Sequence, residues 1–132
     1  MIELSANFKI ITNNPKVKEK YSLVSVEPPG RGVEGVFLAV RNEIHLGANL
    51  ISHPLSGSVK PNESPYKSIV LSNARGALDT YSLQLIEGAI EVLAKLPVRE
   101  LNFPPGVMED FQAIDLDLTD SAIFALPAQY HM

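Results

Sequence analysis

The sequence contains no cysteine among its 132 residues. This absence excludes thiol nucleophiles, disulfide exchange, iron–sulfur ligation and thiolate zinc sites, so any redox step would need an outside partner. A chain of this length buries roughly two-thirds of the surface that it exposes when unfolded, and it can therefore fold without disulfides or a metal. We predict one α/β domain over residues 1–132, with no cofactor.

The chain also lacks an excess of positive charge and any long apolar run. Its 11 basic and 15 acidic residues give a net charge of −4, so the surface has no general attraction for phosphate backbones or anionic lipid. The longest apolar stretches, such as residues 36–40, are far shorter than the roughly 20 residues of a membrane span. Residues 1–4 lack the basic start of a signal peptide. We expect a cytoplasmic protein that binds neither nucleic acid nor membranes.

What the sequence does contain is an alternation of strand-like and helix-like segments. Apolar or alternating runs predict strands at residues 8–12, 22–26, 48–52, 67–72 and 114–118. Helical spacing and capping residues predict helices that start after Asn14, cover 33–44, run from Asp79 to just before Pro97, and follow Asp120. This order predicts a three-layer sandwich with a mostly parallel, Rossmann-like sheet of about five strands.

Two segments are candidates for ligand binding, because ligands of open α/β sheets bind beyond the carboxyl ends of the strands. The first is Thr12-Asn13-Asn14, which leads into a helix start whose free backbone N–H groups attract anions. The alternative is that these residues only cap the helix. The second segment, residues 53–67, contains three prolines and little apolar content. Long loops without regular structure are more often functional than spacers.

The second segment carries groups that suit an anion. Ser56-Gly57-Ser58 offers two hydroxyls and a close backbone approach, and Lys60 adds a positive charge, although the spacing of a P-loop is absent. The alternative is that polar side chains such as Ser64 satisfy the irregular backbone. The complete set of predicted ligand-binding residues is Thr12, Asn13, Asn14, His53, Ser56, Gly57, Ser58, Lys60, Asn62, Glu63, Tyr66 and Lys67.

His53 is the one candidate for catalysis. At the end of a predicted strand it could act as a general base or as a hydrogen-bond donor, with Glu63 or Lys60 as its partner. The alternative is that His53 caps the strand and bonds a backbone carbonyl. Because nothing spaces a nucleophile, a base and an orienting acid in a known arrangement, we rank binding or docking above catalysis.

No metal site is predicted. The three histidines, His45, His53 and His131, do not have metal-ligand spacing. Asp115, Asp117 and Asp120 could hold a hard cation, but on an alternating strand the first two would point outward together and keep that face solvated.

Several of these segments together resemble the GrdX family, the small proteins that accompany the glycine, sarcosine and betaine reductase systems of amino-acid-fermenting anaerobes. The residues that carry the resemblance are 11–15, 17–21, 53–63, 65–68, 109–112 and 114–115. The central stretch, His53-Pro54-Leu55-Ser56-Gly57-Ser58-Val59-Lys60-Pro61-Asn62-Glu63, is the most specific of them because it is long and unusual in composition. Residues 28–35 and the tail after Asp120 take no part in it.

The resemblance implies an accessory protein encoded with a reductase complex, and it transfers no catalytic residue. The catalytic components of such systems work through selenocysteine and cysteine, which this chain could not supply itself. We therefore expect a small anionic metabolite, a reductase component or a second copy of the chain as the partner of the 53–67 loop. An enzyme that uses His53 with Lys60 or Glu63 on a phosphate- or carboxylate-bearing substrate is the alternative.

Overall fold

The computed structural model describes residues 7–57 and 60–131, which are built around a three-stranded sheet. The strands are β1 (Phe8–Thr12), β2 (Ser25–Val26) and β3 (Ser68–Ser72), in the order β2-β1-β3. β1 pairs with β2 in parallel and with β3 antiparallel. The sheet is therefore mixed, and the prediction of about five mostly parallel, Rossmann-like strands is wrong.

Two of the predicted strands are not strands in the structure. Residues 48–52 contribute only an isolated antiparallel bridge between Leu50 and Leu71. Residues 114–118 lie inside a helix, α4 (Pro105–Phe124), which also takes in Asp120 and so replaces the short helix predicted after it. The buried residues of α4 are four apart, and two of them, Asp115 and Thr119, are polar. Because this buried face is largely polar, the spacing of apolar residues does not predict the helix.

The other helices follow the predicted signals. α1 (Pro15–Lys20) is capped by the Asn14 side chain, which accepts from Lys16 N at 3.0 Å. α2 (Gly32–His45) is followed by Gly47 at a φ of 115°. α3 (Thr80–Lys95) begins at Asp79, whose carboxylate accepts from Ser82 N, and it ends before Pro97. A short 3-10 helix, η2 (Ala128–His131), lies beside the start of β1.

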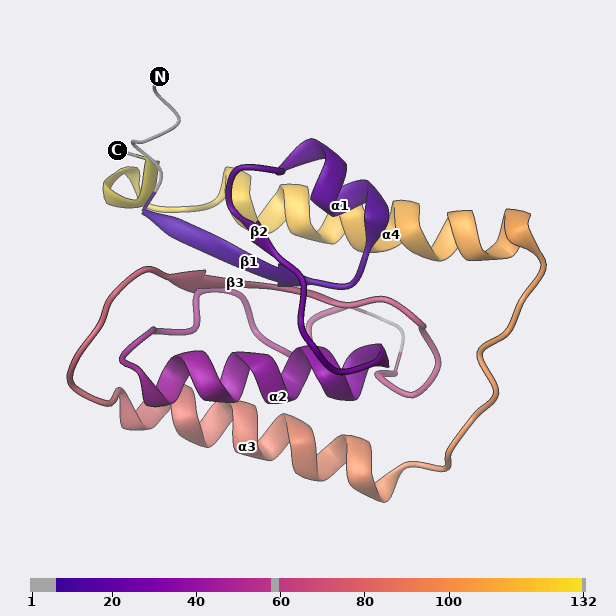
Figure 1. Cartoon of the computed structure of the whole chain (residues 1–132), viewed down its shortest axis with the longest axis horizontal. Coiled ribbons are helices and arrows are strands. Elements are labelled where there is room, and N and C mark those ends of the chain that lie inside the picture. The colour runs from indigo at the N-terminus through magenta and orange to yellow at the C-terminus, as the bar shows by residue number, and fades with distance from the viewer. Residues whose placement is uncertain (1–6, 58–59, 132) are drawn as a thin grey trace.

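The helices cover both faces of the sheet, with α2 and α3 on one side and α1 and α4 on the other (Figure 1). Because successive strand residues point to opposite faces, Ile11 and Ile69 pack with α2 and α3, whereas Ile10 and Val70 pack with α1 and the end of α4. Each side of the sheet thus has its own apolar cluster. Every helix in the described residues is too short or too polar to cross a membrane.

The antiparallel direction of β3 decides where the predicted ligand-binding segments meet. After α2, the chain runs beside the far end of β3 and then returns through residues 53–67 to start β3 next to the end of β1 (Figure 1). In this register Thr12, the last residue of β1, is opposite Ser68, the first residue of β3. The turn at residues 12–14 and the end of the 53–67 loop are therefore neighbours.

Candidate functional site

The Asn13 side chain joins the two segments. Its Oδ1 accepts from Lys67 N at 2.9 Å, and its Nδ2 donates to Pro65 O at 2.9 Å. A side-chain amide that bonds both a backbone N–H and a backbone carbonyl fixes an irregular segment as a neighbouring strand would. Asn13 therefore positions the end of the loop, and both of its polar atoms are already used.

A chain of hydroxyl groups leads from β1 to the carboxylate of Asp115. Ser68 Oγ donates to Asp115 Oδ2 at 2.6 Å, and Thr12 Oγ1 lies 2.7 Å from Ser68 Oγ. Since the single hydroxyl hydrogen of Ser68 points to the carboxylate, Thr12 must be the donor between the two hydroxyls. Thr12 Oγ1 in turn accepts from Asn14 N at 2.9 Å. The hydrogen bonds thus run in one direction and end on a negative charge.

Asp115 is held in place by α1 as well as by the sheet. Asn14, which is fully buried, donates from Nδ2 to Asp115 Oδ2 and to the backbone oxygen of Gln112, both at 2.9 Å. Thr119 donates to the backbone oxygen of Asp115 at 2.8 Å. Among the described residues, both side-chain hydrogen bonds to the Asp115 carboxylate end on Oδ2, which leaves Oδ1 for a ligand.

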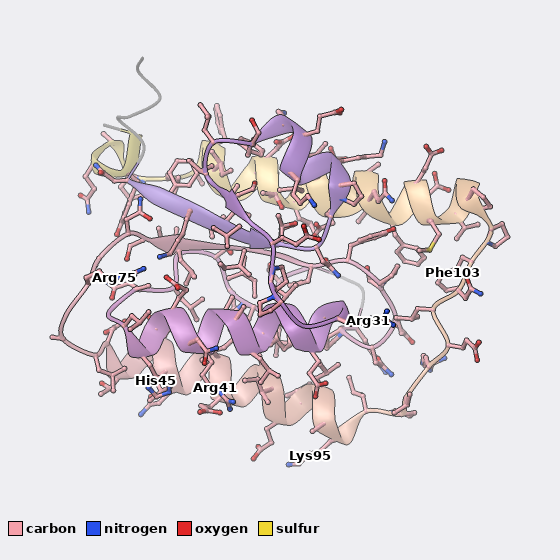
Figure 2. The ribbon with its side chains drawn as sticks, viewed as in Figure 1. Arg31, Arg41, His45, Arg75, Lys95 and Phe103 are labelled. Carbon is pink, nitrogen blue, oxygen red and sulfur yellow. The ribbon has the colours of Figure 1, made fainter. Side chains whose placement is uncertain are left out.

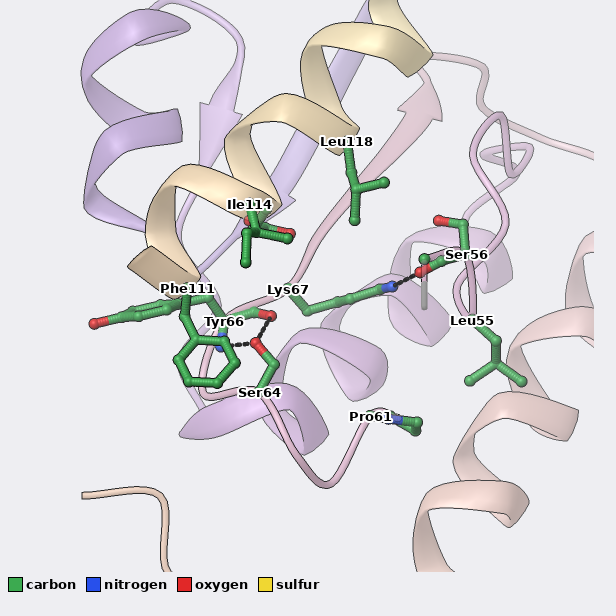
Figure 3. Close-up of a pocket in the computed structure, with 11 residues that line it drawn as sticks. Leu55, Ser56, Pro61, Ser64, Tyr66, Lys67, Phe111, Ile114 and Leu118 are labelled. Atoms are coloured by element: carbon green, nitrogen blue, oxygen red, sulfur yellow. Dashed lines mark hydrogen bonds between the residues drawn. The ribbon is translucent and has the colours of Figure 1, made fainter. Parts of the chain in front are cut away.

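A cavity of about 90 Å³ lies between the loop and α4 (Figure 3). Its polar groups are Lys67 and Asp115, together with Ser56 and Ser64. The rest of its wall is mostly apolar or aromatic and consists of Leu55, Gly57, Pro61, Tyr66, Phe111, Ile114 and Leu118. Drug-sized ligands occupy roughly 300–1,000 Å³, so this cavity suits a ligand of only a few heavy atoms.

Lys67 brings a partly desolvated cation into this cavity. Burial lowers the pKa of the Lys67 ammonium below the ordinary lysine value, and the nearby Asp115 carboxylate offsets part of that effect. Its Nζ donates to the backbone oxygen of Ser56 at 3.0 Å, as the dashed line in Figure 3 marks. An ammonium has three N–H donors, and with this one hydrogen bond in the described structure, two donors remain for a ligand.

The arrangement has the groups needed to bind a small polar molecule. Lys67 offers donors to a carboxylate or phosphate oxygen, Asp115 Oδ1 offers an acceptor, and the apolar wall excludes water from the rest of the ligand. Within the described residues, no group of three or more His, Cys, Asp or Glu side chains could hold a metal ion.

Most of the predicted residues on the two segments do come together around this cavity. Lys67, Ser56, Gly57 and Tyr66 line it. Three more lie behind the cavity. Asn13 bonds the loop, Asn14 bonds Asp115, and Thr12 accepts from the backbone N–H of Asn14. Gly57 has a φ of 103° and a Cβ there would lie 3.0 Å from Leu118, so a glycine fits this wall.

The remaining predicted residues lie elsewhere. His53 is exposed and its Nδ1 accepts from Leu55 N at 3.0 Å, so it bonds a backbone N–H instead of the expected carbonyl. Lys60 is exposed, Glu63 is 3.4 Å from Arg99, and Asn62 is buried with Nδ2 donating to Pro97 O. In the described part of the chain, no hydrogen bond joins His53 to Lys60 or Glu63. Ser58 lies outside the described residues. Whether any of these residues binds or catalyses stays a prediction.

Asp115 and Gln112 are the site residues that the sequence analysis missed. Asp115 was predicted to be solvated on an exposed strand, but it is only 6% exposed inside α4. Gln112, one turn earlier, donates from Nε2 to Tyr66 Oη at 2.8 Å. The available signal was the four-residue spacing of Asp115, Thr119 and Ile123, which marks one face of a helix whatever its polarity.

The comparison with known proteins bears on the same segments. A model of the GrdX-like protein family matches residues 9–124, which is most of the chain, and the chain therefore belongs to this family. The matched region contains the 12–14 turn, the 53–67 loop and α4, and the resemblance predicted from the sequence is confirmed. No curated protein and no solved structure matches the chain.

Proposed function

We propose that this member of the GrdX-like family is an accessory protein of a glycine, sarcosine or betaine reductase system and binds a small carboxylate metabolite at Lys67. Family membership supports the association with such a system. The observation that carries the binding proposal is the Lys67 ammonium, which lies in a small cavity with two donors left over. The Asp115 carboxylate on the same wall favours ligands that also carry a positive or hydrogen-bond-donating group.

Burial of Lys67 is the physical reason for expecting an anion. A buried ammonium with a lowered pKa is costly to keep charged, and the protein gives it no ion pair within the described residues. A bound carboxylate would form a direct ion pair with the ammonium, in addition to the partial compensation from Asp115, in a site of low dielectric where charge-assisted hydrogen bonds are strong. The size of the cavity restricts the ligand to molecules such as acetate, glycolate, glycine or betaine.

Isothermal titration calorimetry with these four compounds tests the proposal. We expect at least one to bind saturably, and we expect Lys67→Met to weaken that binding at least about tenfold, which is the loss of one charge-assisted hydrogen bond. Lys60→Met is the matched control, because Lys60 is exposed and does not line the cavity. Equal losses in both variants, or no saturable binding to the wild type at millimolar concentration, would contradict the proposal.

Docking of the 53–67 loop on a reductase component is the second candidate. Ile114 and Leu118 of α4 are 48% and 40% exposed, so an apolar rim is open beside the loop. Capture of a purified reductase component should be lost in Ile114→Glu, and Lys60→Glu would test the charge of the loop itself. Capture that both variants leave unchanged would count against this surface.

A further inference from the structure

A second and larger cavity lies on the opposite side of the loop from Lys67. It measures about 480 Å³, is open to solvent on one side, and is lined by the start of α2, the end of α3, the segment that follows α3 and residues 61–65 of the loop. Of the residues that line the Lys67 cavity, only Pro61 and Ser64 line this one as well, so the loop forms the wall between them. Its volume is within the range of roughly 300–1,000 Å³ that organic ligands occupy.

The start of α2 gives this cavity an anion-binding end. Arg31 precedes the helix without a side-chain cap, and the first intrahelical bond is made by Gly35 N to Arg31 O at 2.9 Å. The N–H groups of residues 32–34 come before that bond and are open to an anion. Arg31 has no ion pair in the described part of the chain and lines the cavity, as does Arg99.

The turn before α2 has glycines at the three positions where a phosphate-binding turn needs them. Residues 30–35 read Gly-Arg-Gly-Val-Glu-Gly, follow β2 and open the helix. Gly32 has a φ of 65°, and apart from its own helix and chain neighbours no described heavy atom lies within 4 Å of the place of a Cβ, so a ligand can approach its backbone. A Cβ on Gly35 would lie 2.4 Å from the carbonyl carbon of Gly30, so the turn packs directly on the helix.

A buried acceptor without a partner lies in the wall of the same cavity. Asn62 is 8% exposed, and its Nδ2 donates to Pro97 O, but its Oδ1, which is shielded from solvent, accepts no hydrogen bond from the described residues. An orphaned buried acceptor is unfavourable until a donor reaches it. The neighbouring wall is mostly apolar, from Phe37, Ile90, Leu93, Leu96 and Leu101. A ligand that fits these features has an anionic end, a flat or apolar body and an N–H donor.

From these observations we infer that the cavity binds a mononucleotide, with its phosphate at the start of α2 and its base in the apolar part beside Asn62. The Glu34 carboxylate, which also lines the cavity, is an acceptor for ribose hydroxyl groups. A dinucleotide is not proposed, because residues 50–60 contain no acidic residue where a dinucleotide fold carries its ribose ligand. This second site extends the proposed function and does not depend on Lys67.

Calorimetric titration with AMP, ADP, adenosine and inorganic phosphate tests this inference. We expect AMP or ADP to bind saturably, and inorganic phosphate and adenosine each to bind at least about tenfold more weakly, because each lacks half of the contacts. Arg31→Ala should weaken nucleotide binding at least about tenfold. Arg41→Ala is the matched control. Arg41 lies on α2 away from Arg31 (Figure 2), does not line the cavity and pairs with Glu87, so its removal should change the affinity less than about twofold.

Three outcomes would overturn the inference: no saturable nucleotide binding at millimolar concentration, equal losses in the two arginine variants, or phosphate binding as tightly as the nucleotide. Arg31 is exposed, so its removal should not unfold the protein, and a thermal melt checks this. Lys67→Met should keep nucleotide binding, and Arg31→Ala should keep carboxylate binding. Failure of either site is therefore distinguishable from failure of the other.

Discussion

Asn14 performs three separate tasks with one side chain. It caps α1, donates to the backbone of Gln112 and donates to the Asp115 carboxylate, all from a fully buried position. The sequence indicates the first task because an asparagine before a proline is a helix-start signal. The other two depend on Gln112 and Asp115 of α4, which are 98 and 101 residues away in the chain, and no local pattern indicates them.

We predict that Asn14→Ala lowers the free energy of unfolding by about 2–4 kcal/mol, because it removes a helix cap and leaves buried acceptors without a donor. Urea denaturation at neutral pH measures the change. Asn49→Ala is a suitable control, since Asn49 is exposed and has no side-chain hydrogen bond in the described structure. A loss below about 0.5 kcal/mol would mean that the three hydrogen bonds do not contribute as described.

Lys67 has a cost for stability that follows from its lowered pKa. The folded state binds the Lys67 proton less tightly than the unfolded state does, so the residue destabilises the fold below its folded pKa. That penalty disappears as the pH rises through the window between the lowered pKa and the ordinary lysine value of about 10.4.

Lys67→Met should therefore be at least as stable as the wild type at pH 7, with an advantage that shrinks towards pH 10. Thermal unfolding at the two pH values measures this difference, and Lys60→Met, at an exposed position, should change little at either pH. A Lys67→Met variant that melts lower at pH 7, with the gap unchanged at pH 10, would show that Lys67 is not penalised by burial.

Among the helices and strands, the elements with a conventional apolar face are those that sequence reasoning placed correctly. β1, α2 and α3 each have a regular apolar period and a recognisable start or end. The same reasoning does not predict α4, because its buried face includes the polar residues Asp115 and Thr119. The alternation of Ile114, Leu116 and Leu118 with polar residues is instead typical of a strand. The exception is the element that supplies the carboxylate of the candidate site.

The sheet itself could not be predicted from local pattern. Whether β3 runs parallel or antiparallel to β1 depends on the path of the chain between α2 and β3. The described parts of this path, residues 46–57 and 60–67, have no regular structure beyond the bridge at Leu50. The predicted meeting of the 12–14 turn with the 53–67 loop is nevertheless confirmed by the hydrogen bonds of Asn13. The geometry differs from the predicted one. The end of β1 meets the start of β3, whereas the prediction required the carboxyl ends of two parallel strands to meet.

Two glycines within helices should respond to alanine in opposite directions. Gly35→Ala places a Cβ against the Gly30 backbone, which cannot yield like a flexible side chain, and should destabilise the protein by about 1–3 kcal/mol. The Cβ of Gly88→Ala in α3 meets no described atom outside its own helix within 4 Å, so this change should stabilise the protein by about 0.5–1 kcal/mol. Chemical denaturation of both variants measures the contrast. Similar effects in the two would disprove the close approach of the turn to α2.

At the level of the complete fold, Glu43 links three separate parts of the chain. The carboxylate on α2 pairs with Lys9 of β1 and, at 3.0 Å, with Arg75 in the segment after β3. Burial by itself would raise the pKa of Glu43, but the two cations outweigh it and hold the pKa below the ordinary glutamate value.

The pairing of Glu43 should therefore stabilise the fold above the ordinary glutamate pKa of about 4.3, and this contribution should be lost as the pH falls through the lowered folded value. Glu43→Gln should melt lower than the wild type at pH 7, by an amount that corresponds to about 1 kcal/mol or less. The difference should shrink near pH 3. Glu91→Gln, whose pairing with Lys95 is far more exposed, is the control. A gap that does not depend on pH would contradict this role.

The direct test of the Lys67 cavity is a two-dimensional ¹H–¹⁵N NMR titration of the wild-type protein with glycine, acetate, glycolate and betaine. The geometry predicts saturable shifts for at least one compound, confined to the amides of Ser56, Lys67, Ser68 and Asp115 and their neighbours, and absent in Lys67→Met. Shifts that scatter over the surface, that persist in Lys67→Met, or that never appear with any of the four would contradict binding at this cavity.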